Sequence, residues 1–402
     1  MEDKTEKGIS KKTCSPRVLV YWPENELRPC GGPSGYLFSL SRGLREIDYS
    51  VDFLRVRVDL GESKLKKRMA RFEGLANIHR LLKLKSLCSR SSKRPDNLET
   101  YDIIHFHSTQ DLFEAREWIN GFGGKVLLTS HTPCAPHLEK LDWITNQHIR
   151  RVAEAHLKSS LEAIDAYAFK KADYVVFPAK EAEEPYRNTW AAYEGITADS
   201  KKIYMPTGCA QGNVKVSRKI YREEFGIPDD AFVVSYVGRH NEVKGYKVLK
   251  KFAEKYLLHD EKTWFLIGGK EHPYKGLDHP RWVEVGWTDD PHSLIAASDV
   301  FVLPNKETYF DLVLLEVMSL GIPIVASRTG GNKYFDARKD SGILLYGDIA
   351  ELGHKLNGLR DDKETALKLG QKNKKIYLSE FTERAFAERY QQVLRRIAHK
   401  ND

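Results

Sequence analysis

Short apolar runs alternate with helical patterns along nearly the whole chain, and this alternation restricts the fold more than any other feature. Such a pattern is typical of parallel strands joined by helices, so an α/β fold is expected. The expected strands of the first half are Arg17–Trp22, Ser50–Val56, Ile103–His107, Val126–Ser130, Tyr174–Pro178 and Lys202–Pro206. Those of the second half are Phe232–Val237, Thr263–Ile267, Trp282–Val285, Val300–Leu303, Ile322–Ala326 and Gly342–Leu345.

A segment rich in small and polar residues, 207–217, divides the chain, and we predict it to be an interdomain linker. The two halves predict two Rossmann-like domains that face a cleft, one over 16–206 and one over 218–380. Residues 381–402 are expected to form a helix that packs back toward the N-terminal domain, and the charged segment 1–15 a disordered tail. Because ligands bind outside the carboxyl ends of parallel strands, the loops after the strands are the candidate sites.

Much of the formal net charge of +8 lies in the stretch 64–94, where Glu73 is the only acidic residue among many lysines and arginines. Apolar side chains are interleaved at roughly helical spacing. Such a stretch predicts contact with an anionic membrane surface or an anionic acceptor, and the alternative is a solvated basic helix. No recognition motif accompanies it, so nucleic acid is not an expected partner.

The remaining composition favours a cytoplasmic protein. No apolar run is long enough to span a bilayer, and the first residues lack the apolar core of a secretory signal. The five cysteines are scattered without a C-x-x-C pair, which predicts free thiols in a reducing compartment. We therefore expect a cytoplasmic chain, peripheral at the inner membrane face.

Two glycine-containing loops follow expected strands. Gly31-Gly32-Pro33-Ser34-Gly35 precedes a helix expected from near Tyr36, where glycines let the backbone approach a ligand and free N–H groups favour an anion. The loop is not the G-x-G-x-x-G of dinucleotide sites, and a tight turn is the alternative. After Val237, Gly238, Arg239, Lys244 and Gly245 lead into a second helix. Its two cations could clamp two phosphates, or they could simply be solvated.

Three histidines cluster on the expected strands of the first half. His105 and His107 share one face of a strand, and His131 ends the next strand. No carboxylate or cysteine at ligand spacing completes a zinc set, so no metal is expected. His131 is the better functional candidate because it emerges at the cleft, although a hydrogen-bonded structural histidine is the alternative.

The segment 304–327 contains Glu316 in an otherwise apolar helix. Burying a carboxylate is costly unless it has a partner, so this position predicts a function besides packing. The chain contains no D-x-D sequence and no G-x-x-x-x-G-K-[ST], G-x-S-x-G or H-E-x-x-H motif.

These segments together, from about Pro16 to about Val393, resemble retaining glycosyltransferase family 4, which has the GT-B fold with C-terminal helices returning toward the N-terminal domain. The resemblance rests on the two glycine loops, on Ser130-His131-Thr132, on Ala297-Ser298-Asp299-Val300-Phe301-Val302-Leu303-Pro304 and on the Glu316 segment. It implies that Arg239 and Lys244 bind the donor diphosphate, and that Glu316 binds the ribose. His131 would lie near the donor sugar, and Gly31 and Gly32 near the diphosphate and acceptor. The remaining donor-binding candidates are Gly238, Glu307, Thr308, Tyr309, Phe310, Asp311 and Leu312.

The sequence departs from the family pattern at three places. Thr308 stands where the first acid of the E-x7-E motif is expected, Asp311 stands where a glycine usually follows the Phe, and Asn332 follows Gly330-Gly331 where the family has Glu. Asp311 is the expected N-cap of the Glu316 helix. These departures concern the sugar hydroxyls, so sugar identity is the part of the site most open to change.

The resemblance implies a metal-independent, retaining transferase of the hexosyl or N-acetylhexosaminyl type, with an N-terminal acceptor domain and a C-terminal nucleotide-sugar domain. It needs no cofactor besides its co-substrate, a nucleotide-diphosphate sugar that we expect to be a UDP-sugar. The acceptor would be a glycan, lipid-linked or protein-linked hydroxyl, as in polysaccharide biosynthesis. One alternative is a catalytically inactive GT-B subunit that supports a partner transferase. Another is an enzyme acting on the sugar nucleotide itself, such as an epimerase.

Overall fold

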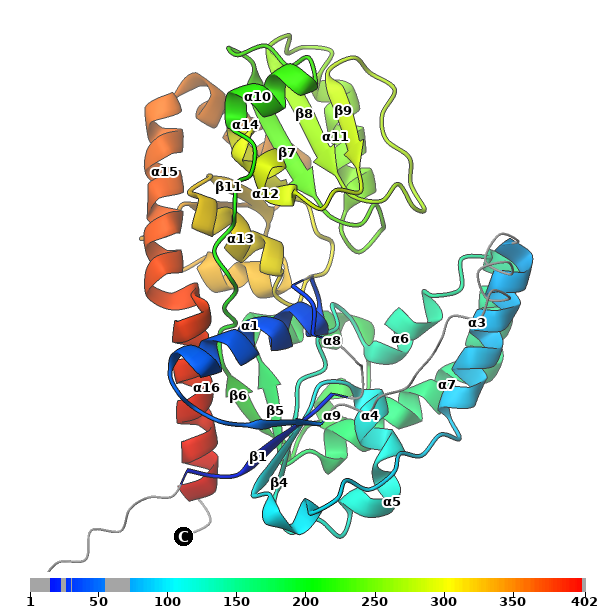
Figure 1. Cartoon of the computed structure of the whole chain (residues 1–402). Helices are drawn as coiled ribbons and strands as arrows, with labels where there is room; N and C mark the ends of the chain where they lie inside the picture. The colour runs from blue at the N-terminus through cyan, green and yellow to red at the C-terminus, as the bar shows by residue number, and fades with distance from the viewer. Residues whose placement is uncertain (1–14, 23–26, 30, 55–72, 400–402) are drawn as a thin grey trace, which may run out of the picture.

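The computed structural model describes residues 15–22, 27–29, 31–54 and 73–399. It contains two domains stacked end to end, each with a parallel sheet between helices (Figure 1). The expected α/β fold with two Rossmann-like domains is therefore confirmed. The expected tail 1–15 lies almost wholly outside the described residues.

The N-terminal sheet has the strand order β2-β1-β3-β4-β5-β6, and the pairs are parallel. The side chains of β1, β3 and β5 are buried along their whole length, as expected of strands covered by helices on both faces. Its strands are β1 Val18–Tyr21, β2 Asp52–Leu54, β3 Ile103–Phe106, β4 Lys125–Leu128, β5 Tyr174–Phe177 and β6 Lys201–Tyr204. Its helices are α1 Pro33–Glu46, α3 Glu73–Leu87, α4 Thr109–Glu114, α5 Arg116–Ile119, α6 Pro136–Leu141, α7 Gln147–Lys171, α8 Glu184–Thr189 and α9 Tyr193–Ile196.

The C-terminal sheet has the order β12-β11-β10-β7-β8-β9, again with parallel pairs. Strands β8 and β9 lie on one side of β7, and β10, β11 and β12 lie on the other. The loops after β7 and β10 are therefore at the topological switch point. Its strands are β7 Phe232–Val237, β8 Thr263–Gly268, β9 Trp282–Gly286, β10 Val300–Leu303, β11 Ile324–Ser327 and β12 Ile343–Tyr346. Its helices are α10 Arg218–Glu224, α11 Tyr246–Tyr256, α12 Pro291–Ala296, α13 Leu312–Leu320, α14 Ile349–Asp361 and α15 Lys363–Ile376.

Two segments cross between the domains side by side. Cys209 forms an isolated parallel bridge with Thr382, and its N–H donates to the carbonyl of Phe381 at 3.0 Å. The second crossing continues into α16, Glu383–Ala398, which packs on α1 beside the N-terminal sheet (Figure 1). A Cβ on Gly43 of α1 would lie 2.0 Å from the carbonyl oxygen of Glu383, so this contact requires glycine. The expected return of the C-terminal helices toward the N-terminal domain is thus confirmed.

The expected linker is hydrogen-bonded along the C-terminal domain. The Gly212 N–H donates to Ser319 Oγ at 2.9 Å, and the Asn213 N–H donates to His292 Nδ1 at 3.1 Å. These contacts hold the segment against α12 and α13, and they bring it to the edge of the space between the domains.

The structure describes residues 73–94 of the basic stretch, and residues 64–72 lie outside the described residues. Residues 73–87 form α3, which packs through Leu84 and Leu87 on α7, and the two helices project from one side of the N-terminal domain (Figure 1). Leu75, Ile78 and Leu82 are exposed. No helix among the described residues combines the length and apolarity needed to cross a membrane.

Candidate functional site

A cavity of about 920 Å³ lies between the two domains. It is bounded by loops at the carboxyl ends of strands from both sheets, where ligands of such folds bind. Most of the sequence-predicted site residues meet there, although they come from distant parts of the chain. Those that line the cavity are Gly31, Gly32, His131, Gly238, Arg239, Lys244, Tyr309, Phe310, Asp311, Leu312 and Glu316.

The N-terminal glycine loop opens α1 toward the cavity. The helix begins at Pro33, three residues earlier than expected, and Gly32 is its N-cap with φ 77°. That left-handed conformation favours glycine, and beyond its chain neighbours no described residue places an atom within 4 Å of where its Cβ would be. The first N–H groups of α1 are therefore open to a ligand in the cavity.

The second loop carries the two cations. Gly245 has φ 66°, and a Cβ there would lie 1.7 Å from the carbonyl oxygen of Pro304, so only glycine lets α11 start against the end of β10. This contact brings Lys244 close to Asp311, whose Oδ1 accepts from Lys244 Nζ at 2.5 Å. Lys244 is largely shielded from water, whereas the side chain of Arg239 is 63% exposed.

Glu316 does not occupy a buried position, so that expectation is wrong. Its side chain is 28% exposed on the cavity face of α13, while neighbouring Leu315 and Val317 are buried. His292 Nε2 lies 3.8 Å from Glu316 Oε2, beyond hydrogen-bond distance. Because His292 Nδ1 accepts from the Asn213 N–H, the proton of this ring is on Nε2 and faces the carboxylate.

His131 lies on the opposite wall in a strained backbone conformation, with φ 60°. Its Nε2 lies 2.9 Å from His107 Nδ1, so one ring donates and the other accepts. Burial lowers the pKa of His131 to about 3, and it lowers the pKa of His107 well below its usual value. His131 therefore presents a neutral imidazole to the cavity at physiological pH.

His105 continues this stack away from the cavity. Its Nδ1 lies 3.0 Å from the Tyr390 hydroxyl of α16, and its Nε2 lies 2.8 Å from Thr129 Oγ1. Burial lowers its pKa to about 3. Both ring nitrogens thus have protein partners. Among the described residues, no group of three or more His, Cys, Asp or Glu side chains is arranged to hold a metal ion.

Glu139 lines the same wall, and the sequence reasoning missed it. It lies on α6, just after the His131 loop, and its Oε1 is 3.9 Å from Arg239 Nη2 of the other domain. Burial raises the pKa of Glu139, and the Arg239 guanidinium opposes that rise. A carboxylate shortly after a strand-end histidine was the available signal, but α6 is too short to show a periodic pattern.

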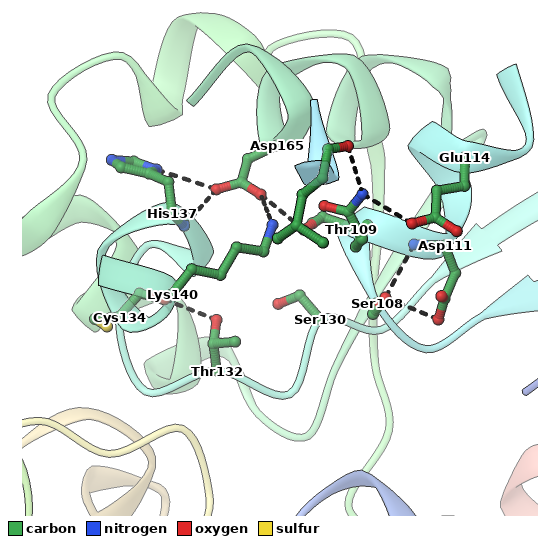
Figure 2. Close-up of polar contacts among 12 residues, drawn as sticks. Ser108, Thr109, Asp111, Glu114, Ser130, Thr132, Cys134, His137, Lys140 and Asp165 are labelled. Carbon is green, nitrogen blue, oxygen red and sulfur yellow. Dashed lines mark hydrogen bonds and ion pairs between the residues drawn. The ribbon is translucent and has the colours of Figure 1, made fainter. Parts of the chain in front are cut away.

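A buried carboxylate fixes α6 from behind (Figure 2). Asp165 of α7 accepts from the His137 N–H at 2.6 Å and from Thr109 Oγ1 at 2.7 Å, and it lies 3.4 Å from Lys140 Nζ. Burial alone would raise the pKa of Asp165, but Lys140, His137 and Thr109 hold it below its ordinary value. Because His137 and Lys140 flank Glu139 on α6, this network sets where Glu139 stands.

The C-terminal wall also contains residues that the sequence reasoning did not select. They follow β9, lie on α12 or belong to the linker. None of these segments contains the glycine loop or the apolar helix with an acid on which the sequence prediction was based. The lining residues of this group are Asn213, Lys215, Trp287, Thr288, Asp289, Asp290 and His292.

Comparisons with known proteins agree with this arrangement. The family model described as Glycosyl transferases group 1 matches residues 231–362, the part of the chain that runs from β7 through α14. This part of the chain is similar to the glycosyl transferases group 1, and the two domains together have the GT-B fold. The expected family resemblance is confirmed at this level.

Among similar proteins, the D-inositol 3-phosphate glycosyltransferase of Corynebacterium efficiens is 32% identical over 167 residues, which are 37% of this chain and 39% of the relative. The O-antigen biosynthesis glycosyltransferase WclY of Escherichia coli is 26% identical over 230 residues, 55% of this chain and 61% of WclY. The chain thus spans 39% to 61% of the length of these relatives. Anabaena HepE, solved in complex with UDP-glucose, has a similar fold, with a TM-score of 0.59 at 16% identity over 94% of this chain and 99% of HepE.

Two expected site residues do not line the cavity. Thr308 is fully buried, and its carbonyl accepts from the Gly331 N–H at 3.1 Å. Glu307 accepts from Asn188 Nδ2 at 3.3 Å outside the lining residues. Asp311 does occupy the N-cap position of α13, as expected, but its side chain makes no capping bond. It accepts instead from Lys244 and from Asn305 Nδ2, the latter at 2.7 Å.

Proposed function

We propose that this protein is a metal-independent, retaining glycosyltransferase that takes a hexosyl or N-acetylhexosaminyl group from a UDP-sugar. The observation that carries the proposal is the meeting of Arg239, Lys244 and Glu316 on one wall of a cavity that His131 faces from the other domain. Two cations suit a diphosphate, and a partly exposed carboxylate suits ribose hydroxyls. The UDP-glucose complex of HepE, which shares the fold, supports the choice of UDP.

The reaction follows from these positions. The bond between the sugar C1 and the diphosphate oxygen breaks, the acceptor oxygen bonds to C1 on the same face, and the acceptor proton passes to the departing phosphate. Arg239 and Lys244 stabilise the negative charge that develops on this leaving group, as preorganised charges do in a site with little water. These cations supply the charge for which other enzymes use a metal ion. Neutral His131 hydrogen-bonds to the sugar.

The test is a screen of nucleotide sugars with the purified chain. UDP and one UDP-sugar should raise the melting temperature, because a ligand that binds only the folded state stabilises it by mass action. Replacing Arg239, which is largely exposed, by alanine should lower transfer about 100- to 1,000-fold with an unchanged melting temperature. Lys219→Ala, an exposed cation of the same domain, is the control. Full activity of Arg239→Ala would contradict the phosphate assignment.

A second candidate function is an inactive subunit that supports a partner transferase. The observation that favours it is the pairing of Lys244 with Asp311, together with the burial of Thr308 away from the cavity. The two functions separate in one assay. Hydrolysis of a UDP-sugar, or transfer from it, by the purified chain excludes the inactive subunit, whereas UDP binding without turnover favours it.

We also propose that the protein is cytoplasmic and touches an anionic membrane through α3. Leu75, Ile78 and Leu82 are exposed at spacings that put them on one face of the helix, and Lys83 and Lys85 supply positive charge. The chain should co-sediment with phosphatidylglycerol vesicles at low salt, and serine at these three positions should abolish binding. Leu258→Ser, at an exposed leucine of the other domain, is the control. Equal sedimentation of both variants would refute the proposal.

A further inference from the structure

The two walls of the cavity differ in the charge that they offer a substrate. The C-terminal wall contains Arg239 and Lys244, which suit a diphosphate. Among the described lining residues of the N-terminal wall, Glu139 is the one acidic side chain, and no lysine or arginine lines that wall. The other polar side chains there are Tyr36, Ser130, His131 and Thr132, which are neutral.

The Glu139 carboxylate retains hydrogen-bonding capacity. Its contact with Arg239 is 3.9 Å long, which is an ion pair without a hydrogen bond, and no other described residue donates to its oxygens. Its side chain is 32% exposed and lines the cavity. Both carboxylate oxygens can therefore accept hydrogen bonds from a molecule in the cavity.

The position of this carboxylate is fixed by the structure behind it. His137, two residues before Glu139, donates its N–H to the Asp165 carboxylate. Lys140, directly after Glu139, forms an ion pair with the Asp165 carboxylate (Figure 2). Asp165 has no exposed surface. A side chain carried on an element anchored this way can select a ligand because it does not have to be ordered first.

We propose that Glu139 recognises the acceptor, and that the acceptor unit that reacts is a neutral sugar instead of a phosphorylated one. This inference rests on the proposed function. When the donor diphosphate takes Arg239, Glu139 loses its cation and its two oxygens accept from hydroxyls of the acceptor. A phosphate on the same unit would meet both this carboxylate and the donor diphosphate, and like charges held close together disfavour binding.

The experiment measures binding of small acceptors by ligand-observed NMR, with and without saturating UDP. The probes are the methyl glycosides of glucose, galactose, mannose and N-acetylglucosamine, each beside its 6-phosphate. The wild type should bind at least one neutral glycoside about tenfold more tightly than its 6-phosphate. Glu139→Gln should weaken that glycoside about tenfold, and Glu139→Lys should reverse the order of the pair. Glu117→Gln, at an exposed carboxylate of α5, should change neither.

Three outcomes would overturn the inference: stronger or equal binding of the 6-phosphates by the wild type, no binding of any neutral glycoside, or an unchanged glycoside affinity in Glu139→Gln. Melting temperatures of the variants show whether each is folded. UDP affinity is measured separately by calorimetry. If the wild type does not bind UDP, the proposed function is contradicted. The comparison of glycosides made without UDP would still decide the role of Glu139.

Discussion

The two walls of the cavity are built on opposite principles. On the C-terminal wall, Lys244 and Asp311 already form a close pair without a ligand, and Arg239 extends toward the other domain. On the N-terminal wall, His131 and His107 are held neutral in a packed stack. A ligand can displace the ion pairs of the C-terminal wall, whereas the side chains of the N-terminal wall are held in place by packing. The difference suggests that donor affinity is set by competition between charges, and acceptor choice by shape and a single carboxylate.

The N-terminal wall depends most on Asp165, which gives the largest expected effect. Asp165→Ala leaves Lys140 buried without its partner, so the free energy of unfolding in urea should fall by about 3–5 kcal/mol. Asp199→Ala, an exposed acid of the same domain, should change it by less than about 0.5 kcal/mol. If the walls are independent, UDP affinity of folded Asp165→Ala stays near that of the wild type. A large loss would show that the two walls are coupled.

The neutral histidine stack predicts a smaller, pH-dependent effect. Burial lowers the pKa of His105 to about 3, so its contribution to stability is complete above about pH 6.5, the unfolded value. It is lost as the pH falls from there toward 3, because the unfolded chain binds the proton first. For each such histidine, the free energy of unfolding should fall by about 1.4 kcal/mol per pH unit in this window.

Half-buried acids such as Glu139, whose pKa burial raises, oppose this trend in the wild type. The informative quantity is therefore the difference between wild type and His105→Gln, measured by urea unfolding from pH 7.5 to 4.5. Because glutamine does not titrate, the difference should shift steadily in favour of the variant as the pH falls. A difference independent of pH would show that the pKa of His105 is the same in the folded and the unfolded protein.

The sequence predicted the sheets well and the site incompletely, for physical reasons. Strands buried on both faces leave continuous apolar runs, so each expected strand appears within a few residues of its range. Glu316 was wrongly expected to be buried, because helical neighbours do not reveal which face borders a cavity. Glu139 was missed because its partner, Arg239, belongs to the other domain. The Lys244–Asp311 pair likewise depends on how α11 meets β10, which no local pattern encodes.

The C-terminal wall gives the smallest predicted effect and the most direct test of competition between Asp311 and a diphosphate for Lys244. Lys244 and Asp311 are 18% and 15% exposed, so their pair is largely shielded from water. If a diphosphate must displace Asp311 from Lys244, Asp311→Asn should bind UDP about three- to tenfold more tightly by calorimetry, which corresponds to about 0.7–1.4 kcal/mol. Asp289→Asn removes the same charge from an exposed acid that lines the cavity, and its effect should be smaller. Weaker binding by Asp311→Asn would mean instead that this carboxylate holds Lys244 in the orientation that the diphosphate needs, and the C-terminal wall would then be as preorganised as the N-terminal one.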